Sequence, residues 1–224
     1  MKDPFFLLLQ INDASFPIGA YAHSFALETY IREALVTDGP AAEACILQLL
    51  ENSLVYSGLL LLRCAWDAAG DPGRLGELEE LSFAARTPRE QREASLKLGS
   101  RFVKTAAALL PGSVVFDRYR NNSGGRCSHG IAYGVFCAAA GIPREDALGA
   151  FLYAQSSAMV TVCVKTIPLS QTEGQRILSV CRGRFGKVLD KLEGLGPDDL
   201  FRSCPGLDIR SMRHEALASR LYMS

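Results

Sequence analysis

The stretch that decides the fold is Pro143-Arg-Glu-Asp-Ala-Leu-Gly-Ala-Phe-Leu-Tyr-Ala-Gln-Ser-Ser-Ala-Met-Val-Thr-Val-Cys-Val-Lys165. A proline at the start and the carboxylates of Glu145 and Asp146 suit the positive end of a helix dipole. The rest is apolar on most sides of a helix, and its small polar residues permit other helices to approach closely. The pattern predicts a central helix that reaches about Lys165.

Helical periodicity dominates on both sides of this segment, and few β-branched residues alternate as a strand requires. We therefore expect an all-α fold, a single-domain bundle of about eight to ten helices over residues 1–224. The stretch 121–126, rich in Asn, Ser and Gly, is the best candidate for a mobile loop. The other predicted helices cover residues 4–10, 17–34, 40–69, about 73–86, 90–110, 128–140 and 170–194.

Two of these helix starts carry a capping box, in which a Ser or Thr is followed three residues later by Glu. They are Thr87-Pro88-Arg89-Glu90, which also places proline at the first helical position, and Ser170-Gln171-Thr172-Glu173. The motif at Thr87–Glu90 makes that start the most sharply defined in the chain.

Composition limits the classes of partner. Lys plus Arg equal Asp plus Glu at 24 each, so no global field would hold nucleic acid or an anionic membrane. The longest apolar run, 54–62, is shorter than the roughly 20 residues that a membrane span needs. Seven cysteines without a CxxC pair, and a start without a convincing signal peptide, predict a cytoplasmic protein.

Catalytic and metal-binding motifs are weak. The three histidines, His23, His129 and His214, lie in distant segments, and Cys127 with His129 lacks the second ligand pair that makes a zinc motif specific. The stretch 183–187 lacks the glycine spacing of a phosphate loop. We expect no enzyme activity, no cofactor and no metal site.

The C-terminal segment 205–224 mixes charged side chains with apolar ones. Such a mixture suits an interface that can order a mobile end, and equally an amphipathic last helix on the protein's own core. Upstream, residues 13–28 crowd turn residues and aromatics around His23 and Glu28. This region is either a shaped surface or a core formed by Phe16, Tyr21 and Phe25.

The segment 8–28, Leu-Leu-Gln-Ile-Asn-Asp-Ala-Ser-Phe-Pro-Ile-Gly-Ala-Tyr-Ala-His-Ser-Phe-Ala-Leu-Glu, resembles the N-terminal signature of the UreF family of urease accessory proteins. The stretches 129–134, 159–175, 207–215 and 219–222 are similar to the family in order and spacing. Ala26 stands where the family usually has glycine, and Val162-Cys163-Val164 replaces a more polar stretch. The resemblance covers essentially the whole chain.

The resemblance implies an all-helical homodimer that acts as a non-catalytic scaffold in nickel-dependent urease maturation. It would bridge the accessory protein UreD, called UreH in some organisms, and the GTPase UreG, and would act on apo-urease. The tail would become ordered when UreD binds, and Arg220 would hold it in one conformation through several hydrogen bonds. The residues that we expect to bind partners are Arg210, Met212, Arg213, His214, Glu215, Arg220, Tyr222, Lys165, His23 and Glu28.

Two other functions stay open. The protein could bind nickel directly through His23, Cys127, His129 or His214, since imidazole and thiolate are good nickel ligands. It could also stimulate GTP hydrolysis by donating an arginine to UreG.

Overall fold

The predicted central helix is α9 (Arg144–Thr166), which ends within one residue of the prediction. The computed structural model describes residues 4–19, 24, 26–202 and 204–215, and over these ranges it is helical without a strand. The predicted all-α class is confirmed. The other elements, in chain order, are α1 (Pro4–Asn12), α2 (Leu27–Arg32), α3 (Gly39–Asn52), the 3-10 turn η2 (Leu54–Tyr56), α4 (Gly58–Asp67), α5 (Pro72–Ala85), α6 (Arg89–Ala106), α7 (Val114–Asn122), α8 (His129–Ala139), α10 (Gln171–Glu193), the 3-10 turn η3 (Pro197–Asp199) and α11 (Pro205–His214).

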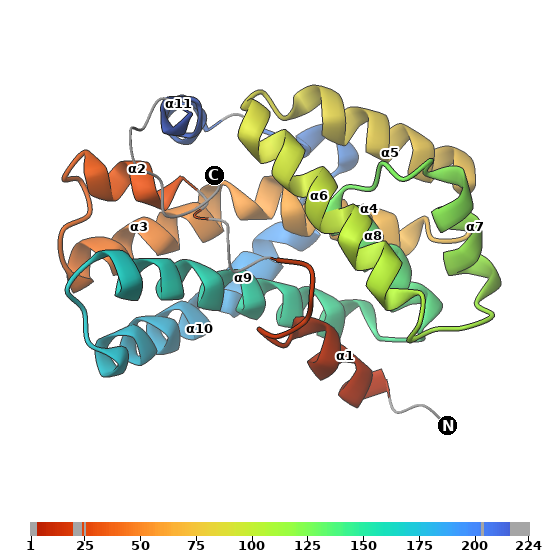
Figure 1. The fold of residues 1–224 in the computed structure, drawn as a ribbon, viewed down its shortest axis with the longest axis horizontal. Coiled ribbons are helices and arrows are strands. Elements are labelled where there is room, and N and C mark those ends of the chain that lie inside the picture. Colours follow the sequence, from red (N-terminus) through yellow and green to blue (C-terminus); the bar gives the residue numbers. More distant parts are fainter. Residues whose placement is uncertain (1–3, 20–23, 25, 203, 216–224) are drawn as a thin grey trace.

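Helix α9 crosses the middle of the molecule and is covered by helices from both halves of the chain (Figure 1). It packs against α1, α2, α3, α4, α8 and α10. One cluster of buried side chains extends along the chain from Leu8 to Leu192, and α9 contributes Phe151, Leu152 and Met159 to it. The organisation as one domain, with 205–224 as a docking segment, stays a prediction.

The single helix predicted over residues 40–69 is wrong, because the chain breaks between α3 and α4. Ser53 and Ser57 leave helical geometry, with φ/ψ of −125°/−61° and −120°/−92°. The Ser57 hydroxyl donates to the Ser53 carbonyl at 2.9 Å, a local bond that competes with the helix. At the start of α4 the chain passes close to α9, where a Cβ on Gly58 would lie 3.3 Å from the Phe151 ring. The hydrogen bond from Ser57 to the Ser53 carbonyl and the close approach of Gly58 to α9 together explain the break.

Helix α4 packs closely against α8 because two glycines of α8 face it. A Cβ on Gly130 would lie 2.9 Å from the Gly58 carbonyl oxygen, and one on Gly134 would lie 2.5 Å from the Leu62 carbonyl oxygen. Both distances are shorter than a carbon atom tolerates, so any larger residue must separate the helices. His129, at the start of α8, lies beside the Phe102 and Phe151 rings in this packing of α4 against α8.

The helix predicted over residues 17–34 is also wrong, because α2 begins only at Leu27. Ala26 precedes it with a left-handed φ of 62°. Further upstream, Asp13 organises a turn: its carboxylate accepts from the Ser15 backbone N–H at 2.7 Å, and its carbonyl accepts from the Phe16 N–H at 2.9 Å. Side-chain hydrogen bonds of this kind favour turns over helices. The predicted core role of Phe16 is confirmed, since this side chain is buried against Phe102.

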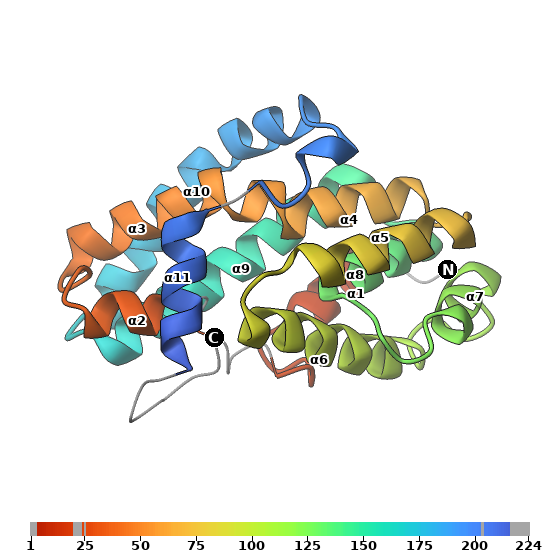
Figure 2. The same ribbon diagram turned by 90° about the horizontal axis from the view of Figure 1, so that it is seen from above.

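Helices α5, α6 and α7 form one end of the bundle (Figure 2). Helix α6 begins at Arg89, close to its predicted start, and ends at Ala106 instead of 110. The capping box predicted at Thr87 is wrong, because Pro88 occupies the N-cap position and supplies no side-chain hydrogen bond to the helix. Helix α7 was not predicted over most of its length, and its last turn occupies part of the predicted loop at 121–126. It is a short helix held by the buried ring of Phe116.

Helix α10 starts at the predicted capping box. The Ser170 hydroxyl accepts from the Glu173 N–H at 3.1 Å, and the Glu173 carboxylate accepts from the Ser170 N–H at 2.8 Å. After α10 and η3 the chain returns as α11, which lies beside α2 and the beginning of α6 (Figure 2). The last described helix is therefore docked on the protein's own bundle.

Two segments, Gly39–Asp67 and Arg144–Thr166, are apolar and long enough to cross a membrane by length and composition alone. Helices in the core of a folded bundle can be equally long and apolar. The first segment contains the break at Ser53 and Ser57, and its Glu51 pairs with Arg184 and Lys187 of α10 at 3.0 and 3.2 Å. The apolar character of both segments is explained by packing inside the bundle.

Candidate partner-docking site

The C-terminal helix α11 is the structural centre of the predicted site. Pro205 occupies its first turn, where the missing N–H costs nothing, and its last residue is His214. The helix packs against α2 on one side and α6 on the other. The sequence left this segment open as either a mobile partner-binding end or an amphipathic helix on the protein's own core. Residues 205–214 form such a helix, packed on the bundle.

His214 anchors α11 in the bundle. Its side chain is fully buried, with Nδ1 2.7 Å from the Glu90 carboxylate and Nε2 3.3 Å from the Glu28 carboxylate. Glu28 lies in the first turn of α2 and Glu90 in the first turn of α6. A protonated imidazole donates from both nitrogens, whereas a neutral one donates from only one. His214 therefore joins three helices through two carboxylates.

Two arginines of α11 hold a third carboxylate. Arg210 Nε and Arg213 Nη1 lie 3.0 and 2.9 Å from the two oxygens of Glu33, the residue that follows α2. The hydrogen bond from Arg213 is the main cause that lowers the pKa of Glu33. The Arg210 guanidinium also lies 4.4 Å from the centre of the Tyr30 ring, a cation–π contact. Arg210 thus serves mainly to attach the helix.

Further polar contacts fix the register of α11. The Thr29 hydroxyl donates to the Arg210 carbonyl at 3.1 Å, which ties α2 to the backbone of α11. The Gln91 side-chain amide donates to the buried Ser211 hydroxyl. On the α6 side, Arg89 pairs with Glu215 at 2.8 Å. Hydrogen bonds and ion pairs therefore supply most of the specific contacts that attach this helix.

The outer side of α11 presents a different chemistry. Ile209 and Met212, three residues apart and thus on one helix face, are 48% and 42% exposed. The Arg213 side chain, 64% exposed beside Glu33, adds a cation close to them. We call Ile209, Met212 and Arg213 the exposed edge of α11. It combines an apolar anchor with a charge, a composition typical of protein interfaces.

Six of the predicted partner-binding residues lie on α11 or in contact with it, and they form three groups. Met212 and Arg213 lie on the exposed edge, Arg210 and Glu215 in partly exposed ion pairs, and His214 and Glu28 in the buried anchor. Lys165 is exposed in the last turn of α9, outside the described contacts of α11. His23, Arg220 and Tyr222 lie outside the described residues, as do Tyr21 and Phe25.

Sequence reasoning missed the acceptors on the bundle, namely Glu33, Glu90 and Tyr30. Glu90 had been assigned to a local capping box, and the structure places it against His214, 124 positions away. Glu33 carried no motif. Such contacts arise from the packing of distant segments, so a local pattern offers no signal for them.

The residues of the possible nickel site have structural surroundings. Cys127 is buried with its thiol 3.1 Å from the Ser123 hydroxyl, and burial raises its pKa, which disfavours the thiolate that binds metal. The His129 ring contacts the rings of Phe102 and Phe151, with ring centres 5.9 and 5.5 Å away. Across the described ranges, no three or more His, Cys, Asp and Glu side chains converge as a metal site.

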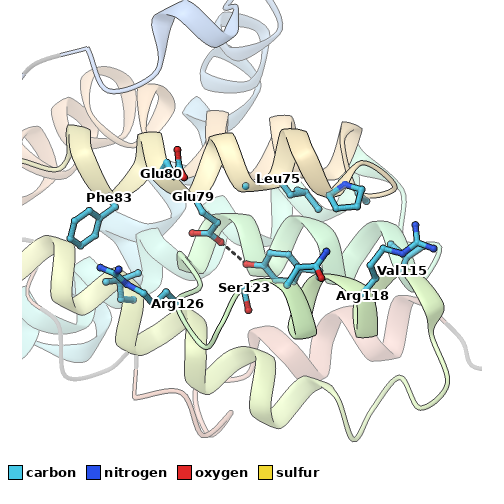
Figure 3. Close-up of a pocket in the computed structure, with 14 residues that line it drawn as sticks. Leu75, Glu79, Glu80, Phe83, Val115, Arg118, Ser123 and Arg126 are labelled. Atoms are coloured by element: carbon cyan, nitrogen blue, oxygen red, sulfur yellow. Dashed lines mark hydrogen bonds between the residues drawn. The ribbon is translucent and has the colours of Figure 1, made fainter.

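A cavity of about 300 Å³ opens between α5, α6 and α7 (Figure 3). Glu79 is the most buried acid there: it accepts from the Tyr119 hydroxyl at 2.6 Å and from the Ser128 backbone N–H at 2.8 Å. Burial raises the pKa of Glu79 despite these bonds. Exposed Arg118 and Arg126 stand at its edges. Glu79 here fastens α5 to α7 and to the start of α8.

The comparisons with known proteins agree on one family. The family model UreF matches residues 36–182. The chain is 34% identical over 222 residues to the urease accessory protein UreF of Bacillus sp. (strain TB-90), with 97% of each chain covered. It is 33% identical over 220 residues to the urease accessory protein UreF of Arthrobacter sp. (strain FB24), covering 97% of this chain and 96% of the relative. The similarity spans nearly the whole chain.

Proposed function

Because this chain belongs to the UreF family of urease accessory proteins, we propose that it is a non-catalytic scaffold in nickel-dependent maturation of apo-urease. In this role it bridges UreD, or UreH, and the GTPase UreG. It acts as a homodimer in the cytoplasm, where its seven free cysteines stay reduced. Neither nucleic acid nor a membrane is among its partners.

The observation that carries this proposal is the exposed edge of α11. Ile209 and Met212 offer exposed apolar side chains that a partner could cover, and Arg213 offers a donor for a partner carboxylate. His214 and Glu28, both buried, hold the helix in place and contribute to recognition through position rather than contact. Arg220 and Tyr222 extend the proposed surface beyond the described residues, and Lys165 contributes a second, separate contact with the GTPase.

Direct nickel binding is less well supported than scaffolding. Both ring nitrogens of His214 are directed at carboxylates, and the Cys127 thiol is buried and bonded to Ser123. A nickel ion at either residue would have to replace these contacts. Equilibrium dialysis of the purified protein with nickel separates the two functions, because tight stoichiometric binding that a His129→Ala or His214→Ala variant loses would favour the metal-binding role.

The test of the proposed surface is a pull-down with candidate UreD and UreG. We expect Met212→Glu to lower the amount of at least one retained partner about tenfold or more, because it places a charge in an apolar contact. Leu81→Glu is the matched control, since Leu81 on α5 is 41% exposed, nearly as much as Met212. Equal retention by wild type and Met212→Glu would show that α11 is not the docking surface.

The function itself is tested in cells that lack this chain. Urease should stay inactive there and regain activity when the wild-type chain is supplied. Arg220→Ala should restore less activity if Arg220 orders the tail for partner binding. Measuring GTP turnover by UreG with and without this protein tests the GTPase-stimulating alternative. Full urease activation without this chain would contradict the scaffold proposal.

A further inference from the structure

A second cavity, of about 140 Å³, lies beneath the beginning of α11. Its wall is largely apolar, and Leu207 of α11 helps to close it. The polar side chains along it include Arg86, Gln91, Ser95, His129 and Gln155. The cavity thus lies where the docking helix meets the bundle, and it is separate from the cavity of Figure 3.

Arg86 lines this cavity, and among the described residues its guanidinium forms no ion pair with a carboxylate. Its Nε is buried and has no hydrogen-bond partner in the part of the chain that the structure describes. Burial lowers its pKa to about 10, and the charge of Glu79 offsets this only in part. The Glu79 carboxylate is itself bonded to Tyr119 and Ser128. A partly buried cation whose Nε is inaccessible to water and makes no hydrogen bond is costly, so its presence calls for an explanation.

The backbone at Phe201 places an aromatic ring beside Arg86. Phe201 has a left-handed φ of 59°, a conformation that residues other than glycine seldom adopt. This conformation is fixed by a bond from the Phe201 N–H to the Tyr56 carbonyl at 2.8 Å. It sets the Phe201 ring against Arg86, with the guanidinium 5.1 Å from the ring centre. The ring holds the guanidinium in place without neutralising its charge.

These features define the ligand. One guanidinium balances one negative charge, and its planar fork matches the two oxygens of a carboxylate. Apolar walls formed by side chains such as Leu98, Phe151 and Met159 suit a short hydrocarbon chain and exclude a strongly hydrated dianion. The volume exceeds what one water needs but falls below that of a typical drug-sized site, so the ligand is small.

We propose that this cavity binds a small organic monocarboxylate, with the carboxylate on Arg86 and the hydrocarbon part among the apolar side chains. The Gln155 side chain, 9% exposed on α9, lines the same space and offers an amide donor. Because Leu207 lines the cavity, the docking of α11 contributes one part of its wall. The inference stands independently of the proposed function.

The experiment is isothermal titration of the full chain with sodium butyrate, with sodium sulfate as the divalent comparison at matched ionic strength. Wild type should bind butyrate saturably, one per chain, and sulfate at least tenfold more weakly. Arg86→Met should weaken butyrate binding at least tenfold. Arg118→Met, at an exposed arginine of the other cavity, should bind as wild type does.

Thermal unfolding gives a second measurement. Butyrate should raise the midpoint of wild type and leave that of Arg86→Met unchanged. Without ligand, Arg86→Met should unfold no earlier than wild type, because it removes a charged group whose buried Nε makes no hydrogen bond among the described residues. If Arg86→Met does not fold, Arg86→Lys replaces it and should bind butyrate more weakly than wild type. Any of three results would overturn the proposal: wild type does not bind butyrate saturably, wild type binds sulfate as tightly as butyrate, or the Arg86 variants bind butyrate as tightly as wild type does.

Discussion

Replacing His214 by alanine should release α11 from the bundle while the rest of the protein stays folded. The imidazole is fully buried and lies 2.7 and 3.3 Å from the carboxylates of Glu90 and Glu28. The mutation removes both contacts and leaves the buried Glu28 carboxylate with less compensation. Helix α11 has few other buried side chains, so the cost falls on its docking.

The magnitude follows from these contacts. Hydrogen bonds to charged groups contribute about 1.5–3 kcal/mol each, and breaking a buried charge pair costs about 3–5 kcal/mol. Arg32, 3.9 Å from Glu28, still compensates part of the charge, which places the loss near the lower end, at about 3 kcal/mol. Such a loss corresponds to a roughly hundredfold change in an opening equilibrium.

The assay is native-state hydrogen exchange, which resolves the opening of single helices. Backbone amides of α11 should lose about a hundredfold of their protection in His214→Ala, while amides in the middle of α9 should keep theirs. Arg176→Ala, which breaks an exposed pair with Glu43, is the control and should leave α11 unchanged. A change of less than about threefold in α11 would refute the anchoring role of His214.

Three further predictions concern stability. Gly134→Ala places a Cβ 2.5 Å from the Leu62 carbonyl oxygen. Alanine favours a helix more than glycine does, but the clash should outweigh this gain and lower the free energy of unfolding, measured in urea, by about 2 kcal/mol. Ser170→Ala removes a hydroxyl that accepts a backbone N–H at 3.1 Å, and should cost about 1 kcal/mol in the same titration. The hydrogen bond from Arg213 lowers the pKa of Glu33 in the folded protein. The stability that ionised Glu33 contributes is therefore fully present above its ordinary pKa of 4.5, and it is lost as the pH falls through the lowered pKa. Glu33→Gln should therefore flatten the loss of α11 protection in acid, and an unchanged acid profile would contradict this.

The sequence predicted those parts of the fold that local patterns determine. Helix α9 and the capping box at Ser170 follow from charge placement and local hydrogen bonds, and the structure contains both. The predicted helix over 40–69 failed because hydrophobic periodicity continues across Ser53 and Ser57, whereas the backbone breaks there to fit against α9. Periodicity reports which side chains are buried, and it does not report such a change of direction.

At the candidate site too, local patterns were predicted from the sequence and contacts between distant segments were not. The charged residues of α11 were recognised from their mixture with apolar neighbours, but their partners were not. Glu28, assigned to a surface or its vicinity, is buried because His214 reaches it across 186 positions of sequence. Arg86 carried no motif at all, and its significance depends on the folded structure, in which it forms no ion pair with any described carboxylate and the Glu79 carboxylate is bonded to Tyr119 and Ser128 instead. Such pairings belong to tertiary structure.

The balance of contacts around α11 leads to a last prediction, on salt. The pairs of Glu33 with Arg210 and Arg213, and of Arg89 with Glu215, are partly exposed. Exposed pairs contribute about 0.2–1 kcal/mol each, and the screening length falls from about 10 Å at 0.1 M salt to about 3 Å at 1 M. Raising sodium chloride should therefore lower the protection of α11 amides by up to about tenfold, with α9 unaffected.

The sign of this salt effect distinguishes two kinds of docking. A helix held by apolar contacts keeps or gains protection in salt, because burial of apolar surface is not screened. A helix held by ion pairs loses protection, and Glu33→Gln should reduce the salt dependence because it removes two of the three exposed pairs. Ion-paired docking is also the kind that a charged partner can exchange for its own contacts, since Arg210 and Arg213 would find equivalent carboxylates there. Protection that stays constant from low to high salt would show that the exposed pairs contribute little, and that His214 and the apolar side chains alone hold α11.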